Sequence, residues 1–244
     1  MSDIETHPFE PFLPTDARLL MLGTFPPSPK RWCMKFYYPN FQNDMWRIFG
    51  HIFYGDKHHF EVPGQKSFNL DELIPFLRNH HVAIFDTALR VRRTKGTAAD
   101  KDLEIIEQAD LDGILRALPQ CRGVLTAGQL ATKVFTEHFG IDVRHLKMGG
   151  SEPFEFEGRP LRLYRMPSSS RAYPMSVEKK AAYYRQMFDD LSLSDYPLDI
   201  LAEDADALHV LASLRNDEVG IALGGLDELL MHGFKHLQIT VDDH

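Results

Sequence analysis

The chain has 244 residues, a formal net charge of −8 at pH 7 and only two cysteines, Cys33 and Cys121. This length allows one large domain, or one domain with an appendage, and two distant cysteines exclude a disulfide framework, a four-thiolate zinc site and an iron–sulfur cluster. Because the sequence has no run of about 18 apolar residues and no signal-peptide pattern at its N-terminus, we expect a soluble, cytoplasmic protein without a membrane partner.

The first strand and the loop after it form the first candidate site. Residues 1–16 are rich in proline and are expected to form an arm lying on the body, and the apolar run 17–25 predicts a strand buried on both faces. A loop rich in proline and aromatic residues follows, and apolar residues at helical spacing predict a helix over about 43–54. Ligands of open α/β sheets bind outside the carboxyl ends of the strands, so chemistry is expected in residues 23–46.

Two asparagines, Asn40 and Asn43, lie where this helix begins. The simplest interpretation is that one of them is an N-cap, whose side-chain oxygen accepts a hydrogen bond from a free N–H group of the first turn. A helix N-terminus also holds an incoming water or anion well, so capping and catalysis by one amide are compatible.

The middle of the chain alternates between helical and strand patterns. The pattern predicts a histidine-rich loop at 55–69, a helix at 71–79, a strand at 82–86, a helix at 111–118, a strand at 123–127 and a helix at 129–139. The pairs His58-His59 and His80-His81 are adjacent in sequence, and neighbouring side chains point apart, so we expect no metal site there.

Asp86 ends the second strand beside the candidate site. It is expected either to cap the following turn or to orient water. The next segment, 87–100, has four basic residues and predicts a loop that leaves the same sheet edge as the first candidate site. That loop is either an ordinary solvated loop or part of a basic binding face.

A hairpin and a long helix complete the predicted body. Residues 154–166 alternate on both sides of Glu157-Gly158 and predict a hairpin that runs into a fourth core strand. Ser176 is expected to cap an amphipathic helix that extends to Leu191. The alternation predicts an α/β fold, a three-layer α/β/α sandwich whose central, mostly parallel sheet has about four strands.

The loop between that strand and that helix carries Ser168, Ser169, Ser170 and Arg171. Hydroxyl groups and backbone N–H groups at a strand-to-helix turn bind phosphate oxygens, and an arginine adds charge. A serine-rich segment of this kind is also typical of ordinary turns and caps, and both interpretations remain open.

The acidic residues are concentrated at the C-terminus. Of the 27 basic and 35 acidic side chains, 2 and 11 lie in residues 192–244, which leaves 25 and 24 in residues 1–191. The body is therefore nearly neutral, which permits a local basic face for nucleic acid. Apolar strings in 192–244 predict helix, strand, helix and strand, so we expect a domain at 1–191 and a small acidic α+β appendage at 192–244.

Residues 23–46 resemble the first motif of the uracil-DNA glycosylase superfamily. The shared features are Gly-Thr-Phe-Pro-Pro at 23–27, Tyr-Tyr at 37–38 and Asn-x-Met-Trp at 43–46, which are most similar to the mismatch-specific and hypoxanthine-type branches. The resemblance implies that Tyr38 stacks under an extruded base and that Asn43 is catalytic. Phe25 stands where the mismatch-specific branch has its water-positioning asparagine, which argues against uracil or thymine activity of that kind.

The resemblance continues to about residue 191, with Asp86, Gly128 and Pro167 as further landmarks. In this superfamily a loop containing Pro and Ser pinches the DNA backbone and inserts a wedge where the flipped base has left. Residues 168–173 match that loop, with the stretch from Arg171 to Tyr173 at the wedge position.

The resemblance implies a monofunctional DNA glycosylase that hydrolyses the N-glycosidic bond of a deaminated base, hypoxanthine or uracil, in base excision repair. Such a reaction needs an extruded base, stacking, hydrogen bonds to the departing base and one oriented water. We expect Tyr38 and Phe25 to form the apolar pocket, the backbone near Gly23 and Thr24 to contact the base edge, and Asn43 to orient the water. We expect no cofactor, no metal and no lyase activity, and a partner that is DNA with a damaged base.

Two other functions fit the same sequence. One is a non-catalytic module that binds DNA ends or nucleotides on the same fold. The other is a nucleoside hydrolase, which would need a way to hold ribose without a duplex. Base release from duplex oligonucleotides, compared with release from free nucleosides, separates the three.

Overall fold

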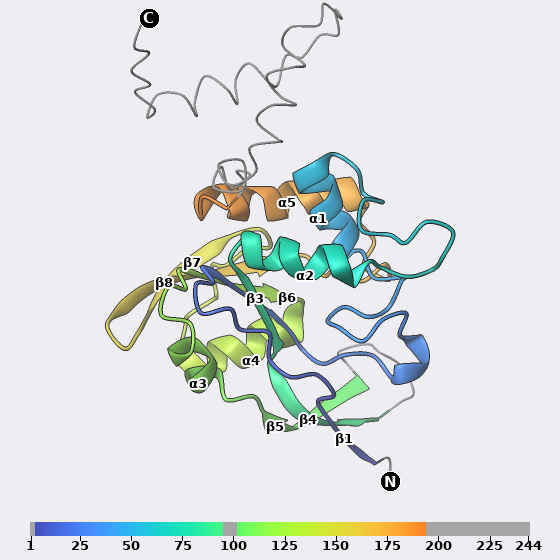
Figure 1. Cartoon of the computed structure of the whole chain (residues 1–244). Helices are drawn as coiled ribbons and strands as arrows, with labels where there is room; N and C mark the ends of the chain where they lie inside the picture. Colours follow the sequence, from blue (N-terminus) through green and yellow to red (C-terminus); the bar gives the residue numbers. More distant parts are fainter. Residues whose placement is uncertain (1–2, 95–101, 194–244) are drawn as a thin grey trace, which may run out of the picture. The chain divides into compact units, whose positions relative to one another are not determined.

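The computed structural model describes residues 3–94 and 102–193 (Figure 1). The chain divides into two compact units, Met1–Ser194 and Asp195–His244. The helix and strand pattern expected for 192–244 falls almost wholly outside the described residues. The elements that follow all belong to the first unit.

A five-stranded sheet forms the centre of this unit. Its order is β3-β2-β6-β8-β7, where the strands are β2 (Leu19–Gly23), β3 (Val82–Asp86), β6 (Gly123–Ala127), β7 (Ser151–Phe156) and β8 (Arg159–Met166). Four strands run parallel, and β7 pairs antiparallel with β8 as the first half of the expected hairpin. Every residue of β2 and β3 is buried, as the continuous apolar runs predict. The predicted α/β class with a mostly parallel central sheet is confirmed, and the hairpin supplies the fifth strand.

The strand register aligns the carboxyl ends of the parallel strands. Gly23 pairs with Asp86, and Ala127 pairs with Met166. The loops that follow these four strands therefore leave one edge of the sheet, where ligands of such sheets bind.

Helices cover both faces of the sheet. They are α1 (Met45–Tyr54), α2 (Leu70–Asn79), α3 (Leu111–Arg116), α4 (Gln129–Phe139) and α5 (Val177–Asp190), with a single 3-10 turn, η1 (Pro29–Arg31). Rings from α1, α2 and α5 contact one another, with Phe49 and Phe53 both touching Phe76 and Phe188. Figure 1 shows these three helices on one side of the sheet and α3 and α4 on the other. No helix in 3–94 or 102–193 is long and apolar enough to cross a membrane.

The ends of the helices follow local capping rules. Ser176 caps α5 by accepting a hydrogen bond from the Lys179 N–H, as expected. Gly55 ends α1 in the left-handed conformation, with φ of 68°. Some elements are shorter than expected: the first strand covers 19–23 instead of 17–25, α1 begins at Met45 instead of residue 43, and α3 ends at Arg116 instead of residue 118.

A second, three-stranded sheet replaces part of the expected loop at 87–100. Its strands are β1 (Ile4–Thr6), β4 (Ala88–Arg93) and β5 (Leu103–Gln108), all antiparallel, in the order β1-β4-β5. The loop prediction is wrong for 88–93 because the basic side chains are paired across strands: Arg92 Nη1 lies 2.7 Å from Glu104 Oε2, and Arg90 pairs with Glu107. The rest of that predicted loop, at 95–100, is outside the described residues. The N-terminal arm lies on the body as expected and adds β1 to this sheet.

Candidate functional site

Two loops that are far apart in the sequence meet at the carboxyl edge of the sheet. Asn43 and Ser170 form an isolated antiparallel bridge, and the Asp44 N–H donates to the Ser169 carbonyl at 2.8 Å. The first motif and the serine-rich loop, each predicted from its own sequence, are therefore in direct contact.

A buried ionic cluster holds this junction together. Asp44 Oδ2 accepts from Lys180 Nζ at 2.9 Å, and Asp44 Oδ1 accepts from Arg171 Nε at 3.0 Å. Lys180 also donates to the Ser170 carbonyl at 2.9 Å, and its side chain is fully buried. Neither Asp44 nor Lys180 was predicted from the sequence, although a lysine on the apolar face of α5, one turn before Tyr184, is a signal that such a cluster exists.

Neither Asn40 nor Asn43 is the expected N-cap of the helix, because the N-cap residue of α1 is Asp44; the Asn43 amide instead makes a local hydrogen bond to the first residue of the helix. Its Oδ1 accepts from the Met45 N–H at 2.9 Å, and Asn40 Oδ1 accepts from the Gln42 N–H at the same distance. A carbonyl oxygen has two lone pairs, so this hydrogen bond leaves Asn43 able to accept one more, from a water molecule. The catalytic role of Asn43 stays a prediction.

The serine-rich loop is built from short turns. Ser168 Oγ accepts from the Ser170 N–H, and Ser170 Oγ accepts from the Ala172 N–H, both at 3.2 Å. Ser169 is buried, whereas about half of the Arg171 side chain is exposed beyond its contact with Asp44. Tyr173, also assigned to DNA contact, donates its hydroxyl to Met148 Sδ.

Gly23 and Thr24 lie at the end of β2, and their carbonyl groups already have backbone partners. Thr87 N–H donates to the Gly23 carbonyl at 2.9 Å, and Ala88 N–H donates to the Thr24 carbonyl at 3.1 Å. A Cβ atom on Gly23 would lie 2.4 Å from Asp86 Oδ1 and 3.7 Å from the Tyr38 hydroxyl. Only glycine fits between these two polar groups.

Two hydroxyl groups beside Gly23, Thr24 Oγ1 and the Tyr38 hydroxyl, are buried without a hydrogen-bond partner in the described part of the chain. Burial, with the nearby charge of Asp86, raises the pKa of Tyr38 well above its ordinary value, so its hydroxyl remains a donor. Unpaired buried hydroxyls are uncommon in folded proteins, and they suit a place where a ligand supplies the missing partner.

The two aromatic residues expected in one pocket have different neighbours. The Phe25 ring contacts His7, with centroids 5.4 Å apart, and lies under the Arg93 guanidinium. The Tyr38 ring meets Trp46 edge to face at 5.8 Å, and Tyr38 has a positive φ of 50°. A side chain that the sequence analysis missed, His7, lies 2.9 Å from Asp86 and is fully buried.

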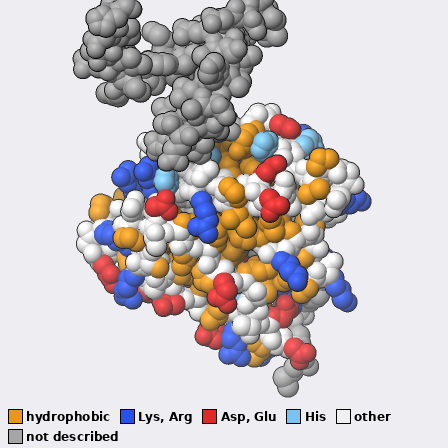
Figure 2. All heavy atoms as spheres, in the orientation of Figure 1, with side chains coloured by type: hydrophobic (Ala, Val, Ile, Leu, Met, Phe, Trp, Pro, Cys, Tyr) orange, Lys and Arg blue, Asp and Glu red, His pale blue; other side chains and the backbone are white. Residues whose placement is uncertain are grey.

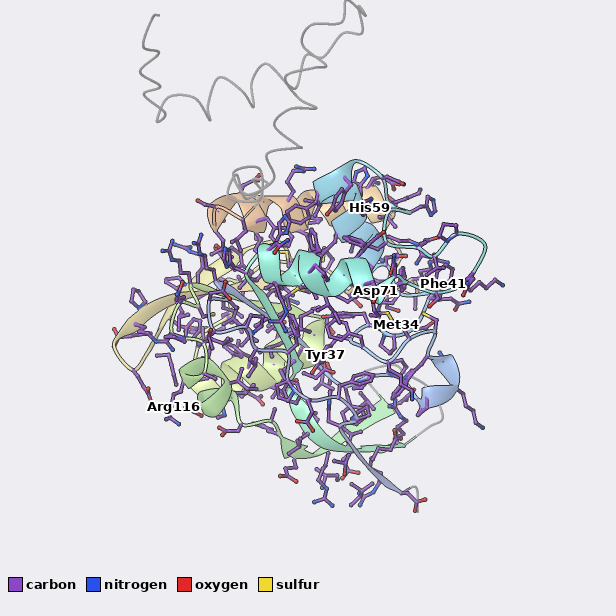
Figure 3. All side chains as sticks on the ribbon, in the orientation of Figure 1. Met34, Tyr37, Phe41, His59, Asp71 and Arg116 are labelled. Atoms are coloured by element: carbon purple, nitrogen blue, oxygen red, sulfur yellow. The ribbon has the colours of Figure 1, made fainter. Side chains whose placement is uncertain are left out.

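Two cavities flank these residues. One, of about 450 Å³, is lined by Asp44, Arg47, Lys57, His58, Arg171, Met175, Ser176 and Val177. The other, of about 480 Å³, is lined by Pro8, Phe9, Glu10, Trp32, Lys35, Phe36 and Tyr37. Figure 2 shows hydrophobic side chains gathered over the middle of the face in view. Figure 3, in the same orientation, labels Tyr37, which lines the second cavity, near the middle of that view. None of the residues expected to contact the base lines either cavity, and Asp44 and Arg171 connect the first cavity to the junction.

The cations that line the first cavity are paired with acidic side chains. Arg47 lies 2.6 Å from Glu61, and Lys57 lies 3.1 Å from Glu178. Among the described residues, no three His, Cys, Asp or Glu side chains come together as metal ligands do.

The fold is similar to that of a solved protein. Neither a protein-family model nor a curated protein matches the sequence. The chain is similar to the solution NMR structure of a "putative uracil DNA glycosylase" from Methanosarcina acetivorans, with a TM-score of 0.54 and 19% sequence identity. The alignment covers 78% of this chain and 99% of the other. At this identity the similarity establishes the fold alone.

Proposed function

We propose that this protein is a monofunctional DNA glycosylase that hydrolyses the N-glycosidic bond of a deaminated base, hypoxanthine or uracil, in base excision repair. The observation that carries the proposal is the contact between Asn43 and Ser170, which joins the first motif to the serine-rich loop at the carboxyl edge of the sheet. Base release needs a base site and a backbone-binding site side by side, because the base must be extruded while the strand is held. The similarity in fold to the Methanosarcina protein supports the same class of function.

The base site is assigned to Gly23, Thr24, Phe25 and Tyr38. Gly23 lies close to Asp86 and Tyr38, where only glycine fits, and the hydroxyls of Thr24 and Tyr38, which have no partner among the described residues, donate to oxygen atoms on the base edge. In the reaction the C1′–N bond breaks, its electron pair stays with the base, and the sugar becomes oxocarbenium-like. Donors fixed against the departing base stabilise the charge that develops on it.

The attacking water is assigned to Asn43. Its Oδ1 is fixed by the Met45 N–H, so the amide is held in one orientation at the N-terminus of α1. The water adds to C1′ and loses its proton to solvent. Lys180 is not a candidate amine nucleophile, because Asp44 and the Ser170 carbonyl hold its Nζ in a fully buried position.

The DNA contacts are assigned to Ser168, Ser169, Ser170, Arg171 and Tyr173. The hydroxyl and backbone groups of the loop hold phosphate oxygens, and Arg171 enters the gap left by the base. Asp44 accepts a hydrogen bond from Arg171 Nε and so holds the near end of the guanidinium group, while about half of the Arg171 side chain stays exposed.

A non-catalytic DNA-binding module is the second candidate. The observation that favours it is the local hydrogen bond from the Met45 N–H to Asn43 Oδ1, because a residue that only orders the start of α1 explains the motif without catalysis.

Duplex oligonucleotides with a single hypoxanthine, uracil or xanthine, tested beside the free nucleosides, separate the two candidates. A glycosylase releases at least one base from the duplexes and none from the nucleosides. Binding without any release favours the module, and release from nucleosides alone indicates a nucleoside hydrolase.

A further inference from the structure

His7 is a buried imidazole that the N-terminal arm brings to the end of β3. Its Nε2 lies 2.9 Å from Asp86 Oδ2, and its side chain is fully buried. Four rings surround it, at centroid distances between 4.7 and 6.1 Å: Phe9, Phe25, Tyr37 and Phe85. An ionised carboxylate only accepts hydrogen bonds, so His7 donates to Asp86 through Nε2–H.

The arm is fixed to β4 and to the loop that follows β2. The His7 N–H donates to the Leu89 carbonyl at 2.8 Å, and β1 pairs with β4. Arg93 donates to Glu5 Oε1 at 2.8 Å and to the Pro26 carbonyl at 2.7 Å, so one guanidinium ties the arm to the loop that follows β2. The arm that carries His7 is thereby held against the loop that follows β2, which includes Thr24 and Phe25 of the proposed base site.

The second carboxylate oxygen of Asp86 lies beside Gly23, a residue of the proposed base site. Oδ1 lies over Gly23, at 2.4 Å from where a Cβ atom would be, and no described residue donates a hydrogen bond to it. The unpartnered hydroxyls of Thr24 and Tyr38 belong to the same group of residues, and Thr24 is 94% buried by residue surface. The site therefore holds one group that only accepts and two that donate, all without partners among the described residues.

We propose that His7 is a positioning residue that acts through Asp86. By holding Oδ2, His7 keeps the carboxylate turned so that Oδ1 accepts a hydrogen bond from a ring N–H of the bound base, while Thr24 and Tyr38 donate to an adjacent carbonyl oxygen. The inference rests on the proposed function, because the ligand is the extruded base. It assigns the site to bases with an N–H beside a C=O, the edge that deamination creates in hypoxanthine and uracil. A methyl group on that nitrogen removes the donor and clashes with Oδ1.

The test is equilibrium binding of free bases to the full-length protein, followed by NMR, which does not depend on catalysis. The pairs are hypoxanthine with 1-methylhypoxanthine and uracil with 3-methyluracil. The variants are His7→Gln, which keeps a donor toward Asp86, and His7→Leu, which removes it. His138→Leu is the matched control, because His138 forms a histidine–aspartate pair with Asp112 on an exposed surface. Where His7→Leu does not fold, His7→Asn replaces it, since that amide is too short to reach Asp86.

The parent protein and His138→Leu are expected to bind the N–H base of one pair at least about 10-fold more tightly than its methylated partner, the scale of one hydrogen bond to a charged group. His7→Gln retains that preference, whereas His7→Leu reduces it to less than about 3-fold. A merely structural role would weaken both members of the pair equally. An unchanged preference in His7→Leu, or no binding of either base by the parent, overturns the proposal. Preferential binding without base release from any duplex leaves this inference standing and removes the glycosylase function.

Discussion

Lys180 donates to Asp44 at 2.9 Å, and neither side chain is accessible to water beyond a few per cent, so the pair joins α5 to the start of α1 inside the protein. Removing one member of a buried pair leaves an uncompensated charge, so Asp44→Asn is expected to lower the free energy of unfolding by about 3–5 kcal/mol. Urea unfolding of Asp44→Asn, Lys180→Met and the double variant measures this. Lys133→Met, which removes an exposed pair with Glu137, is the control and should cost less than about 1 kcal/mol.

In the double variant neither charge of the pair remains, so we expect it to be more stable than Asp44→Asn alone. If the double variant loses as much free energy of unfolding as the two single variants together, Asp44 and Lys180 act independently. In that case Arg171, the other partner of Asp44, would be the important one.

Gly23→Ala tests the close approach of Asp86. The added methyl group would lie 2.4 Å from Asp86 Oδ1, and overpacking of this kind costs about 1–3 kcal/mol. The melting temperature is expected to return toward that of the parent when Asp86→Ala is added, whereas base release is expected to stay reduced. A Gly23→Ala protein with the stability and activity of the parent would contradict the close packing of these two residues.

Thr24→Val and Tyr38→Phe separate function from stability. Each removes a buried hydroxyl that has no partner, so each is expected to leave the melting temperature unchanged or slightly raised. Single-turnover base release should nevertheless fall by about 10-fold or more, because the hydroxyls then no longer donate to the base. Loss of stability in either variant would mean that the hydroxyls have partners in the folded protein. Unchanged release would remove them from the base site.

Arg171→Ala is expected to weaken binding to a lesion duplex more than binding to the same lesion in a single strand. A wedge matters only where a base leaves a stacked helix, and unstacking costs a few kcal/mol. Fluorescence anisotropy on both substrates measures the difference. The control is Arg144→Ala, which removes an exposed arginine paired with Asp142. Equal losses on both substrates would assign Arg171 to phosphate contact alone.

The mostly parallel central sheet could be predicted from the sequence, apart from its fifth strand, and so could the two loops that meet at its carboxyl edge. Continuous apolar runs specify parallel strands, and β2 and β3 are buried at every residue. The contact of Asn43 with Ser170 was beyond prediction from sequence, because it depends on how the strand register and the packing of α1 against α5 place two loops over 120 residues apart.

The missed features share a physical cause. The sequence of β4 predicts a basic loop, because the acidic residues of β5 that neutralise its arginines are not near in the sequence. Only the pairing of the two strands brings them together. His7 is 79 residues from Asp86 in the sequence, and a single histidine in a proline-rich arm has no pattern that predicts burial. Lys180 is buried on the apolar face of α5 only because Asp44 and a backbone carbonyl accept its hydrogen bonds.

The most direct measurement is single-turnover base release from a single-lesion duplex by Asn43→Ala, compared with Asn40→Ala. The two asparagines make the same kind of local hydrogen bond at 2.9 Å, so loss of either is expected to cost about 1 kcal/mol of stability. We expect the parent and Asn40→Ala to release the base at similar rates. Asn43→Ala is expected to release it about 10²- to 10³-fold more slowly, the effect of removing one preorganised polar group. Release by Asn43→Ala at the rate of Asn40→Ala would contradict the account.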